Sequence, residues 1–385
     1  MVRPTGQYRA TSTLGEQVRA FVPYPLPPAD PPLVMDGPAS ELLAAAKTEL
    51  ARLAVAGSMV PSTDWLLYGF VRKEAVVTSQ IEGTQASLRD VVTFEATDHA
   101  DRPDDVQEVC NYVDALAHAR GQLADPRGLP LSIRLICDAH RILMRGVRGE
   151  GKLPGEVRRS QNWIGGARPG NARFVPPPPG EVRDALGALE RWLHDDGGLP
   201  PLVRIGLAHV QFETIHPFLD GNGRIGRLLI ALLVEHWGLL DQPLLYISLA
   251  FKRGQQEYYS RLAAVRSDGD WEGWNRFFLD CVRVAAEDGV RVAQALHALV
   301  GQDRLRIIAH ERPTVAAVRL LERLPSSPVV TVRSATKLLG LTAPPVRKAI
   351  ELLEGLGVLR EITTKRRGRV YAYDEYLRIL TGDEG

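Results

Sequence analysis

The 385-residue sequence predicts a mainly α-helical protein with one small β-hairpin and a C-terminal winged helix-turn-helix domain. Apolar residues recur at helical spacing over most of residues 41–300, for example in 42–53 and 106–123. A turn sequence followed by four consecutive prolines interrupts that pattern at 160–179. Beyond about residue 312, two short helical patterns precede two short β patterns. These observations separate a helical body from a smaller C-terminal unit.

The order of these patterns predicts four segments. Residues 1–40 are rich in proline and polar residues and are expected to form an extended arm. Residues 41–125 are expected to form an N-terminal helical region, 126–300 the core, and 312–385 the C-terminal domain. The helices expected after the hairpin span residues 182–194, 202–215, 226–237, 255–265 and 271–300.

Length and composition agree with an intracellular protein. The net charge of +1 gives the chain no general attraction to nucleic acid or to membranes. Cys110, Cys137 and Cys281 are widely spaced and match neither a disulfide framework nor a zinc site. The first residues contain no apolar targeting segment, and no apolar run is long enough to span a bilayer. We therefore expect a cytoplasmic location and no membrane partner.

Residues 216–227, with the sequence HPFLDGNGRIGR, combine residue types suited to phosphate chemistry. The glycines lie where a helix is expected to begin, so unpaired backbone amides could face an anion. Gly221 and Gly223 would let the backbone approach a phosphate because they have no Cβ atom. His216 could act as a general base, since it can be neutral near pH 7. Asp220 is a hard oxygen ligand suited to Mg²⁺.

Three more polar side chains complete this predicted phosphate site. Asn222 could donate to a non-bridging oxygen, and Arg224 and Arg227 could offer forked donors to the outer phosphates of a triphosphate. Taken singly, each residue has a plain alternative as a structural histidine, a turn or a solvated arginine. Taken together, the segment resembles the Fic family signature HPFxDGNGRxGR, which it matches at every fixed position.

The resemblance implies transfer of AMP from ATP to a hydroxyl side chain of a target protein, which could be the chain itself. Mg²⁺ is the implied cofactor and pyrophosphate the leaving group. By the family pattern, His216 is the base, Asp220 holds Mg²⁺, and Arg227 binds the γ-phosphate. The implied nucleotide-binding residues of this segment are Gly221, Asn222, Gly223, Arg224, Gly226 and Arg227. The acceptor could be a Ser, Thr or Tyr hydroxyl.

A second motif, TSQIEG at residues 78–83, ends a helix expected over 65–81 with Gly83 as its C-terminal cap. Glu82 then lies at the negative end of the helix dipole, which costs some tenths of a kcal/mol up to about 1 unless a cation compensates. The motif resembles the inhibitory sequence [ST]xxxE[GN] of Fic proteins at Thr78, Glu82 and Gly83. In that family the glutamate pairs with the last signature arginine, here Arg227, and blocks the γ-phosphate. A surface glutamate ending a helix is the alternative.

The resemblance implies that two further regions bind the target protein or the nucleotide. Residues 160–179 are expected to form a hairpin, and in Fic proteins such a flap holds the target by strand addition. Phe174 and Val175 would then lie near both the target backbone and the nucleotide. Tyr258 and Tyr259 point about 100° apart on an expected helix, so one can pack inward while the other faces a ligand. The resemblance suggests that one or both line the adenine pocket. An ordinary surface hairpin and core packing are the alternatives.

The C-terminal unit resembles a winged helix-turn-helix, with its second helix over 343–353 and its wing between strands at 359–363 and 370–373. Between residues 331 and 371, nine basic residues oppose three acidic ones. The basic residues are Arg333, Lys337, Arg347, Lys348, Arg360, Lys365, Arg366, Arg367 and Arg369. This excess suits contacts with DNA phosphates. A protein-docking or dimerising domain is the alternative.

Three functions fit the whole sequence. We favour an AMP transferase with an appended regulatory domain, because a nucleotide sensor would need phosphate ligands but no base at His216. The second function is a DNA-binding regulator that uses the Fic portion to sense nucleotide. The third is a hydrolase in which Glu82 activates water to remove AMP from a modified protein. The sequence leaves the target protein and the oligomeric state open, a homodimer included.

Overall fold

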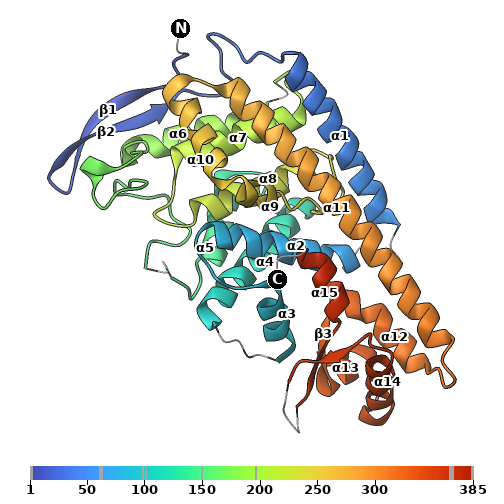
Figure 1. Cartoon of the computed structure of the whole chain (residues 1–385). Helices are drawn as coiled ribbons and strands as arrows, with labels where there is room; N and C mark the ends of the chain where they lie inside the picture. The colour runs from blue at the N-terminus through green and yellow to red at the C-terminus, as the bar shows by residue number, and fades with distance from the viewer. Residues whose placement is uncertain are drawn as a thin grey trace.

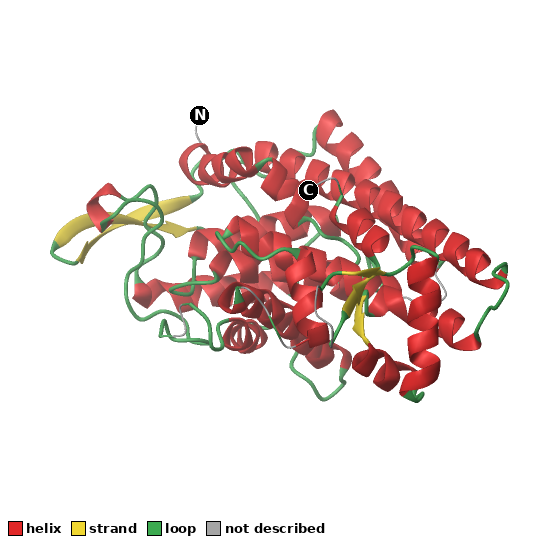
Figure 2. Cartoon of the chain, turned by 60° about the horizontal axis from the view of Figure 1, so that its bottom comes forward, coloured by secondary structure: helices red, strands yellow, loops and turns green. Residues whose placement is uncertain are grey.

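The computed structural model describes residues 3–59, 64–97, 99, 102–148, 151–195, 197–363 and 368–382. The chain is mainly helical, and its described strands occur in two well-separated places (Figure 2). The helices of the body are α1 (Gly37–Ser58), α2 (Asp64–Ile81), α3 (Leu88–Thr97), α4 (Pro103–Ala124), α5 (Ile133–Leu143), α6 (Pro179–Leu193), α7 (Pro201–Ile215), α8 (Asn222–His236), α9 (Ser248–Arg253), α10 (Gln255–Asp268) and α11 (Trp271–Ile308).

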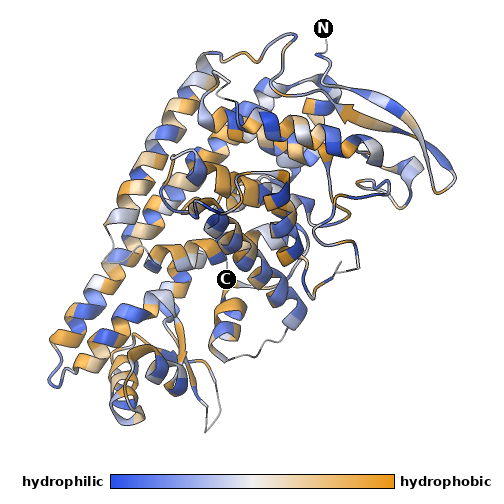
Figure 3. Cartoon of the chain, turned by 180° about the vertical axis from the view of Figure 1, so that it is seen from behind, coloured by the Kyte–Doolittle hydropathy of each residue, from blue (hydrophilic) through white to orange (hydrophobic). Residues whose placement is uncertain are grey.

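The long helix α11 packs along α1 on one side of the body (Figure 1). Apolar and polar residues alternate along both helices, so each has an apolar face to bury (Figure 3). The two backbones approach closely at Gly289, where an added Cβ would lie 2.9 Å from a methyl group of Leu53. α11 continues to Ile308, beyond the predicted end of the core at residue 300.

α7 and α8 form the centre of the body, and every residue of α7 from Leu202 to Ile215 is buried. α2 packs against α4, α8 and α9. This packing brings the C-terminal end of α2 to the N-terminal end of α8. The two motifs at residues 78–83 and 216–227 therefore meet although about 140 residues separate them in the sequence.

The predicted extended arm contains a regular antiparallel hairpin that the sequence analysis did not identify. β1 (Gly6–Thr13) pairs with β2 (Glu16–Pro23), with Gly6 opposite Pro23. Leu14 and Gly15 form the turn, both with positive φ (52° and 78°), as a two-residue hairpin loop requires. The hairpin projects from the helical body at the end away from the C-terminal unit (Figure 2).

The predicted hairpin at 160–179 is present only as one antiparallel bridge, between Ile164 and Phe174. A 3₁₀ turn, η1 (Pro169–Asn171), lies inside it, and prolines follow Val175. Proline cannot donate to a ladder, so the second strand does not continue. Instead, the Phe21 amide of β2 donates to the Val175 carbonyl at 2.9 Å. The regular hairpin beside this segment is therefore β1–β2.

The described residues of the C-terminal unit form four α-helices and a small antiparallel sheet of order β3-β5-β4. Its elements are α12 (Val315–Arg323), η2 (Leu324–Ser326), β3 (Val329–Thr331), α13 (Val332–Leu339), α14 (Ala343–Gly355), β4 (Arg360–Glu361), β5 (Val370–Ala372) and α15 (Asp374–Thr381). The predicted wing residues Lys365, Arg366 and Arg367 lie outside the described residues.

The C-terminal unit packs on the body without a break in the hydrophobic core, which extends from Leu26 to Leu380. The hydroxyl of Tyr376 in α15 donates to the backbone carbonyl of Trp65 in α2 at 2.9 Å. The helix that carries the 78–83 motif at one end thus contacts α15 at the other. Among the described residues, no helix has both the length and the apolar character needed to cross a membrane.

Candidate active site

His216 ends α7 in the left-handed conformation, with φ 50° and ψ 62°. This conformation is costly for a residue other than glycine and persists only where its surroundings hold it. Arg158, from the segment between α5 and α6, supplies that support. Its Nε donates to the His216 carbonyl at 2.9 Å, and its backbone amide donates to the Pro217 carbonyl at 2.9 Å. The turn at His216 breaks the helix and begins the signature loop.

The His216 ring is held in its neutral form. Burial, and after it the positive charge of Arg158, lower its pKa to about 4, although the Glu213 backbone acts in the opposite direction. An ordinary histidine has a pKa near 6.5. At pH 7 the His216 ring is therefore unprotonated and available to accept a proton.

We expect the NMR signals of the His216 ring to titrate with a midpoint near pH 4. Because the folded protein keeps this ring neutral, its chemical shifts should stay constant from pH 8 down to about pH 5.5, where an ordinary histidine is already about 90% protonated. The spectrum of a His216→Ala variant assigns the signal. A midpoint between pH 6 and 7 would contradict the burial argument.

Asp220 lies in the loop between α7 and α8, where its carboxylate is already hydrogen-bonded. Lys152 Nζ donates to Oδ2 at 2.8 Å, and the Gly221 amide donates to Oδ1 at 2.7 Å. Burial raises the Asp220 pKa, but the hydrogen bond and charge of Lys152 outweigh it and hold the pKa below its usual value. The described residues contain no group of three or more side chains that could hold a metal ion. One carboxylate suffices for Mg²⁺ that keeps waters and binds phosphates.

His140 of α5 fixes the Asp220 backbone, a role that the sequence analysis missed. The Gly155 amide donates to its Nδ1 at 2.8 Å, so the neutral ring carries its proton on Nε2. That nitrogen lies 3.0 Å from the Asp220 carbonyl, to which it donates. The ring also stacks on Phe218 with 3.8 Å between centroids. The signature loop is thus held from the α5 side as well.

Asn222 begins α8, and Gly221 precedes it with φ 74°. The Asn222 side chain was predicted to donate to a phosphate, but it is turned to the loop backbone. Its Oδ1 accepts from the Phe218 amide and its Nδ2 donates to the Phe218 carbonyl, both at 2.8 Å. This side chain therefore closes the loop. The first backbone amides of α8, which have no partner within the helix, are the donors left for an anion.

Arg227 is buried and makes the predicted pair with Glu82. One guanidinium nitrogen donates to Glu82 Oε1 at 2.6 Å, and Nε donates to the Thr78 hydroxyl at 2.5 Å. Burial lowers the Arg227 pKa, but the charge of Glu82 outweighs it and raises the pKa above its usual value. Gly223 permits this approach, since an added Cβ would clash with Glu82 Oε1. Gly83 ends α2 with φ 99°, as predicted.

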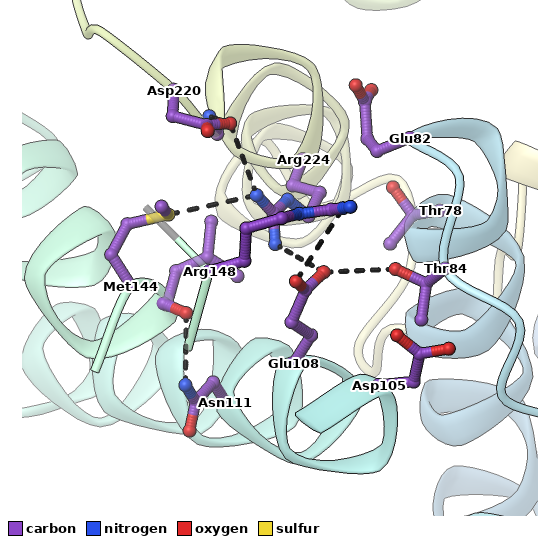
Figure 4. Close-up of polar contacts among 12 residues, drawn as sticks. Thr78, Glu82, Thr84, Asp105, Glu108, Asn111, Met144, Arg148, Asp220 and Arg224 are labelled. Carbon is purple, nitrogen blue, oxygen red and sulfur yellow. Dashed lines mark hydrogen bonds and ion pairs between the residues drawn. The ribbon is translucent and has the colours of Figure 1, made fainter. Parts of the chain in front are cut away.

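Arg224 does not point into open solvent. It is 3% exposed, and a guanidinium nitrogen donates to Glu108 Oε2 of α4 at 3.1 Å (Figure 4). Another nitrogen lies 3.6 Å from Asp220 Oδ1. Both signature arginines are therefore paired with carboxylates from the N-terminal helical region. Only one of these carboxylates, that of Glu82, was predicted from the sequence.

The two tyrosines of α10 separate as expected. Tyr258 is buried, and its hydroxyl lies 2.8 Å from Nε2 of His209, whose Nδ1 lies 3.0 Å from the Gly226 carbonyl. Tyr258 therefore supports α8 from behind. Tyr259 is 47% exposed and is the member of the pair accessible to a ligand. Gly226 has a packing role, since an added Cβ would clash with Glu213.

The two predicted flap residues also differ in surroundings. The Phe174 ring lies 4.0 Å from the guanidinium carbon of Arg266, which places an aromatic and a cationic group together beside the loop. Val175 is buried in a small cluster with Val18 and Ala20 of β2. Its side chain is therefore part of the contact with the N-terminal hairpin.

Comparisons with known proteins point to one family. The Fic/DOC family N-terminal model matches residues 40–121, and the Fic/DOC family model matches residues 130–234. Proteins named protein adenylyltransferase Fic from Drosophila erecta and Drosophila yakuba are each 33% identical to this chain over 156 residues. The shared stretch makes up 40% of this chain but only 28% of each Drosophila protein.

Solved structures share the fold. A Fic family protein from Desulfovibrio desulfuricans G20 superposes with a TM-score of 0.56 at 22% identity, over 89% of this chain and 97% of that one. Fic-1 from C. elegans superposes with a TM-score of 0.50 at 20% identity, over 69% of this chain and 73% of the other. The two matching family models and the complete signature at residues 216–227 make this chain a member of the Fic/DOC family.

Proposed function

We propose that this chain transfers AMP from ATP to a hydroxyl group of a protein side chain. The observation that carries the proposal is the neutral His216 ring, which stands at the end of α7 directly before the N-terminus of α8. This arrangement supports a role for His216 as the base and for the first amides of α8 as phosphate donors. Label from ATP labelled at the α-phosphate should therefore appear on protein. Absence of label from a folded, uninhibited variant would contradict the proposal.

In this mechanism, His216 accepts the proton of the attacking hydroxyl. The hydroxyl oxygen forms a bond to the α-phosphorus, the bond between the α-phosphorus and the bridging oxygen breaks, and pyrophosphate leaves. The first amides of α8 stabilise the charge on the α-phosphate, and Arg224 and Arg227 hold the outer phosphates. The protein contributes chiefly by positioning the reactants and stabilising charge. Tyr259 and Phe174 are the proposed contacts of the adenine.

Asp220 is the proposed Mg²⁺ ligand, and Mg²⁺ would supply charge neutralisation at the leaving phosphates. We expect Asp220→Asn to raise the Mg²⁺ concentration for half-maximal transfer by about tenfold or more, because the carboxylate charge is lost. Lys152→Ala should lower that concentration, because Lys152 competes for the same carboxylate. Initial rates measured over a Mg²⁺ titration check both. An Asp220→Asn variant with the parent's Mg²⁺ requirement would exclude this role.

The pair between Glu82 and Arg227 is the proposed source of inhibition. Arg227 donates hydrogen bonds to Glu82 and Thr78, so its guanidinium is already engaged where the γ-phosphate of ATP would bind. Glu82 can move away more readily than Arg227, since its side chain is 33% exposed and that of Arg227 is 1% exposed. Inhibition of this kind is reversible and requires no change of fold.

A second proposed function is DNA binding by the C-terminal unit as a winged helix. Arg333 and Lys337 of α13 and Arg347 and Lys348 of α14 are exposed, and none forms an ion pair with another described residue. Unpaired cations on two adjacent helices suit phosphate contacts.

The double variant Arg347→Ala/Lys348→Ala should weaken duplex DNA binding and reduce the salt slope of log K by about 1–2, because two phosphate contacts are lost. Fluorescence anisotropy at several salt concentrations measures this. Arg52→Ala is a control, since Arg52 is an exposed cation on α1, outside the C-terminal unit. If the wild-type chain shows no salt-dependent binding of any duplex, the unit has another partner.

A further inference from the structure

Glu108 is a buried carboxylate that joins three parts of the site (Figure 4). It lies on α4, and its side chain is 3% exposed. Oε2 accepts from the Thr84 hydroxyl at 3.0 Å and from Arg224 at 3.1 Å. Oε1 lies 3.8 Å from the guanidinium of the largely exposed Arg148. The carboxylate thus connects α4, the segment just after Glu82 and the first turn of α8.

The Arg224 guanidinium is fixed between two anions. One nitrogen is bonded to Glu108, and the other lies 3.6 Å from Asp220 and 3.8 Å from the sulfur of Met144. In Figure 4 the guanidinium lies between the two carboxylates. Asp220 is itself hydrogen-bonded to Lys152. Glu108 is therefore the carboxylate that sets the direction of the Arg224 fork from the α4 side.

Glu108 differs from Glu82 in how firmly it is held. Glu82 is one-third exposed and has Arg227 as its described ion-pair partner. Glu108 is buried and also accepts a hydrogen bond from Thr84, which is 2% exposed. A buried carboxylate that is paired and hydrogen-bonded is costly to displace, because the cation left behind would also be buried. Glu82 is thus suited to leave when nucleotide binds, and Glu108 is suited to stay.

We propose that Glu108 is a positioning residue, which aims Arg224 at the outer phosphates of the nucleotide and is itself held by Thr84. The inference rests on the proposed AMP transfer from ATP. It concerns binding of the outer phosphates, so it can be tested without transfer. AMP is the appropriate reference ligand, since it has the adenosine and the α-phosphate but lacks the groups that Arg224 would hold.

The test compares the affinities for ATP with Mg²⁺ and for AMP by titration calorimetry, in a Glu82→Gly background. Glu108→Gln keeps the side-chain size but removes the charge, and we expect it to weaken ATP binding tenfold or more while AMP binding stays within about twofold. Thr84→Val, which removes one hydrogen bond from Glu108, should weaken ATP binding by about threefold with AMP binding again unchanged. Thr84→Val also keeps the test valid if Glu108→Gln does not fold.

Two further variants make the result specific. Glu108→Gln combined with Arg224→Ala should bind ATP no more weakly than Arg224→Ala alone, because Glu108 acts through that arginine. Asp105→Asn is the matched control. Asp105 lies on the same helix and accepts from the Gln85 amide at 2.9 Å, and its loss should leave the ratio of ATP to AMP affinity unchanged.

Equal losses of affinity for ATP and for AMP would show that Glu108 has a merely structural role. Tighter ATP binding would show that Glu108 competes with the phosphates. Either result overturns the proposal, as does unchanged binding of both ligands. If the affinities change as expected but no variant transfers AMP, the proposed function fails while the positioning role stands.

Discussion

Replacement of Glu82 by glycine should raise the rate of AMP transfer by about 10- to 100-fold. The hydrogen-bonded ion pair between Glu82 and Arg227 must be broken before the γ-phosphate can use that arginine. Hydrogen bonds to charged groups contribute about 1.5–3 kcal/mol, and each 1.4 kcal/mol corresponds to a factor of ten. The measurement is the initial rate of label transfer from α-labelled ATP to protein.

Two variants test whether the gain comes from this pair. Glu82→Gln keeps the shape of the side chain but loses its charge, so its rate should fall between those of wild type and Glu82→Gly. Glu375→Gln removes a glutamate that pairs with Arg378 in α15 and should leave the rate unchanged. A folded Glu82→Gly variant with the wild-type rate would mean that Glu82 does not inhibit.

His216→Ala, made in the Glu82→Gly background, should reduce transfer by about 10²- to 10⁴-fold, the usual contribution of a general base. ATP binding should change by less than about threefold, because Arg158, His140 and Asn222 hold the loop independently of the His216 ring. The measurements are single-turnover transfer and calorimetric ATP binding.

The left-handed backbone at residue 216 calls for a second variant. Alanine is strained at φ 50°, whereas asparagine adopts this conformation more readily and is not basic. His216→Asn should therefore be as inactive as His216→Ala. Activity in either variant close to that of the parent would assign the proton transfer to another group.

Both motifs were recognised in the sequence because each lies within one short segment, and their contact in the fold was predicted. HPFLDGNGRIGR and TSQIEG lie in short segments whose glycines and helix ends can be recognised without the rest of the chain. The pairing of Glu82 with Arg227 followed from the family pattern, and a salt bridge of 2.6 Å joins them. The end of α2 at Ile81 followed from Gly83, whose φ is 99°.

Residues that act across the fold were missed. Arg158 and His140 hold the loop through backbone carbonyls of residues 216 and 220, and nothing near them in the sequence signals this. For Glu108, the sequence does contain a signal. It occupies the same face of α4 as the buried Tyr112 and Ala115, at positions i, i+4 and i+7, where a charged side chain needs a partner.

Two side chains with predicted binding roles have partners that only the fold supplies. The Asn222 amide is bonded to the Phe218 backbone, and Val175 packs on β2. The β1–β2 hairpin was not predicted, since no residue of β1 is buried and the strand shows no alternation of apolar and polar residues. The prolines around it suggested an unpaired arm instead.

The central claim is that Glu82 restrains an AMP transferase whose base is His216. The most direct measurement incubates wild type, Glu82→Gly and Glu82→Gly/His216→Ala with Mg²⁺ and either α- or γ-labelled ATP, with and without added cell lysate. We predict that protein gains label from α-labelled but not γ-labelled ATP, that Glu82→Gly raises it, and that loss of His216 abolishes it. No protein label from α-labelled ATP with folded, ATP-binding Glu82→Gly would contradict the account and favour removal of AMP or nucleotide sensing.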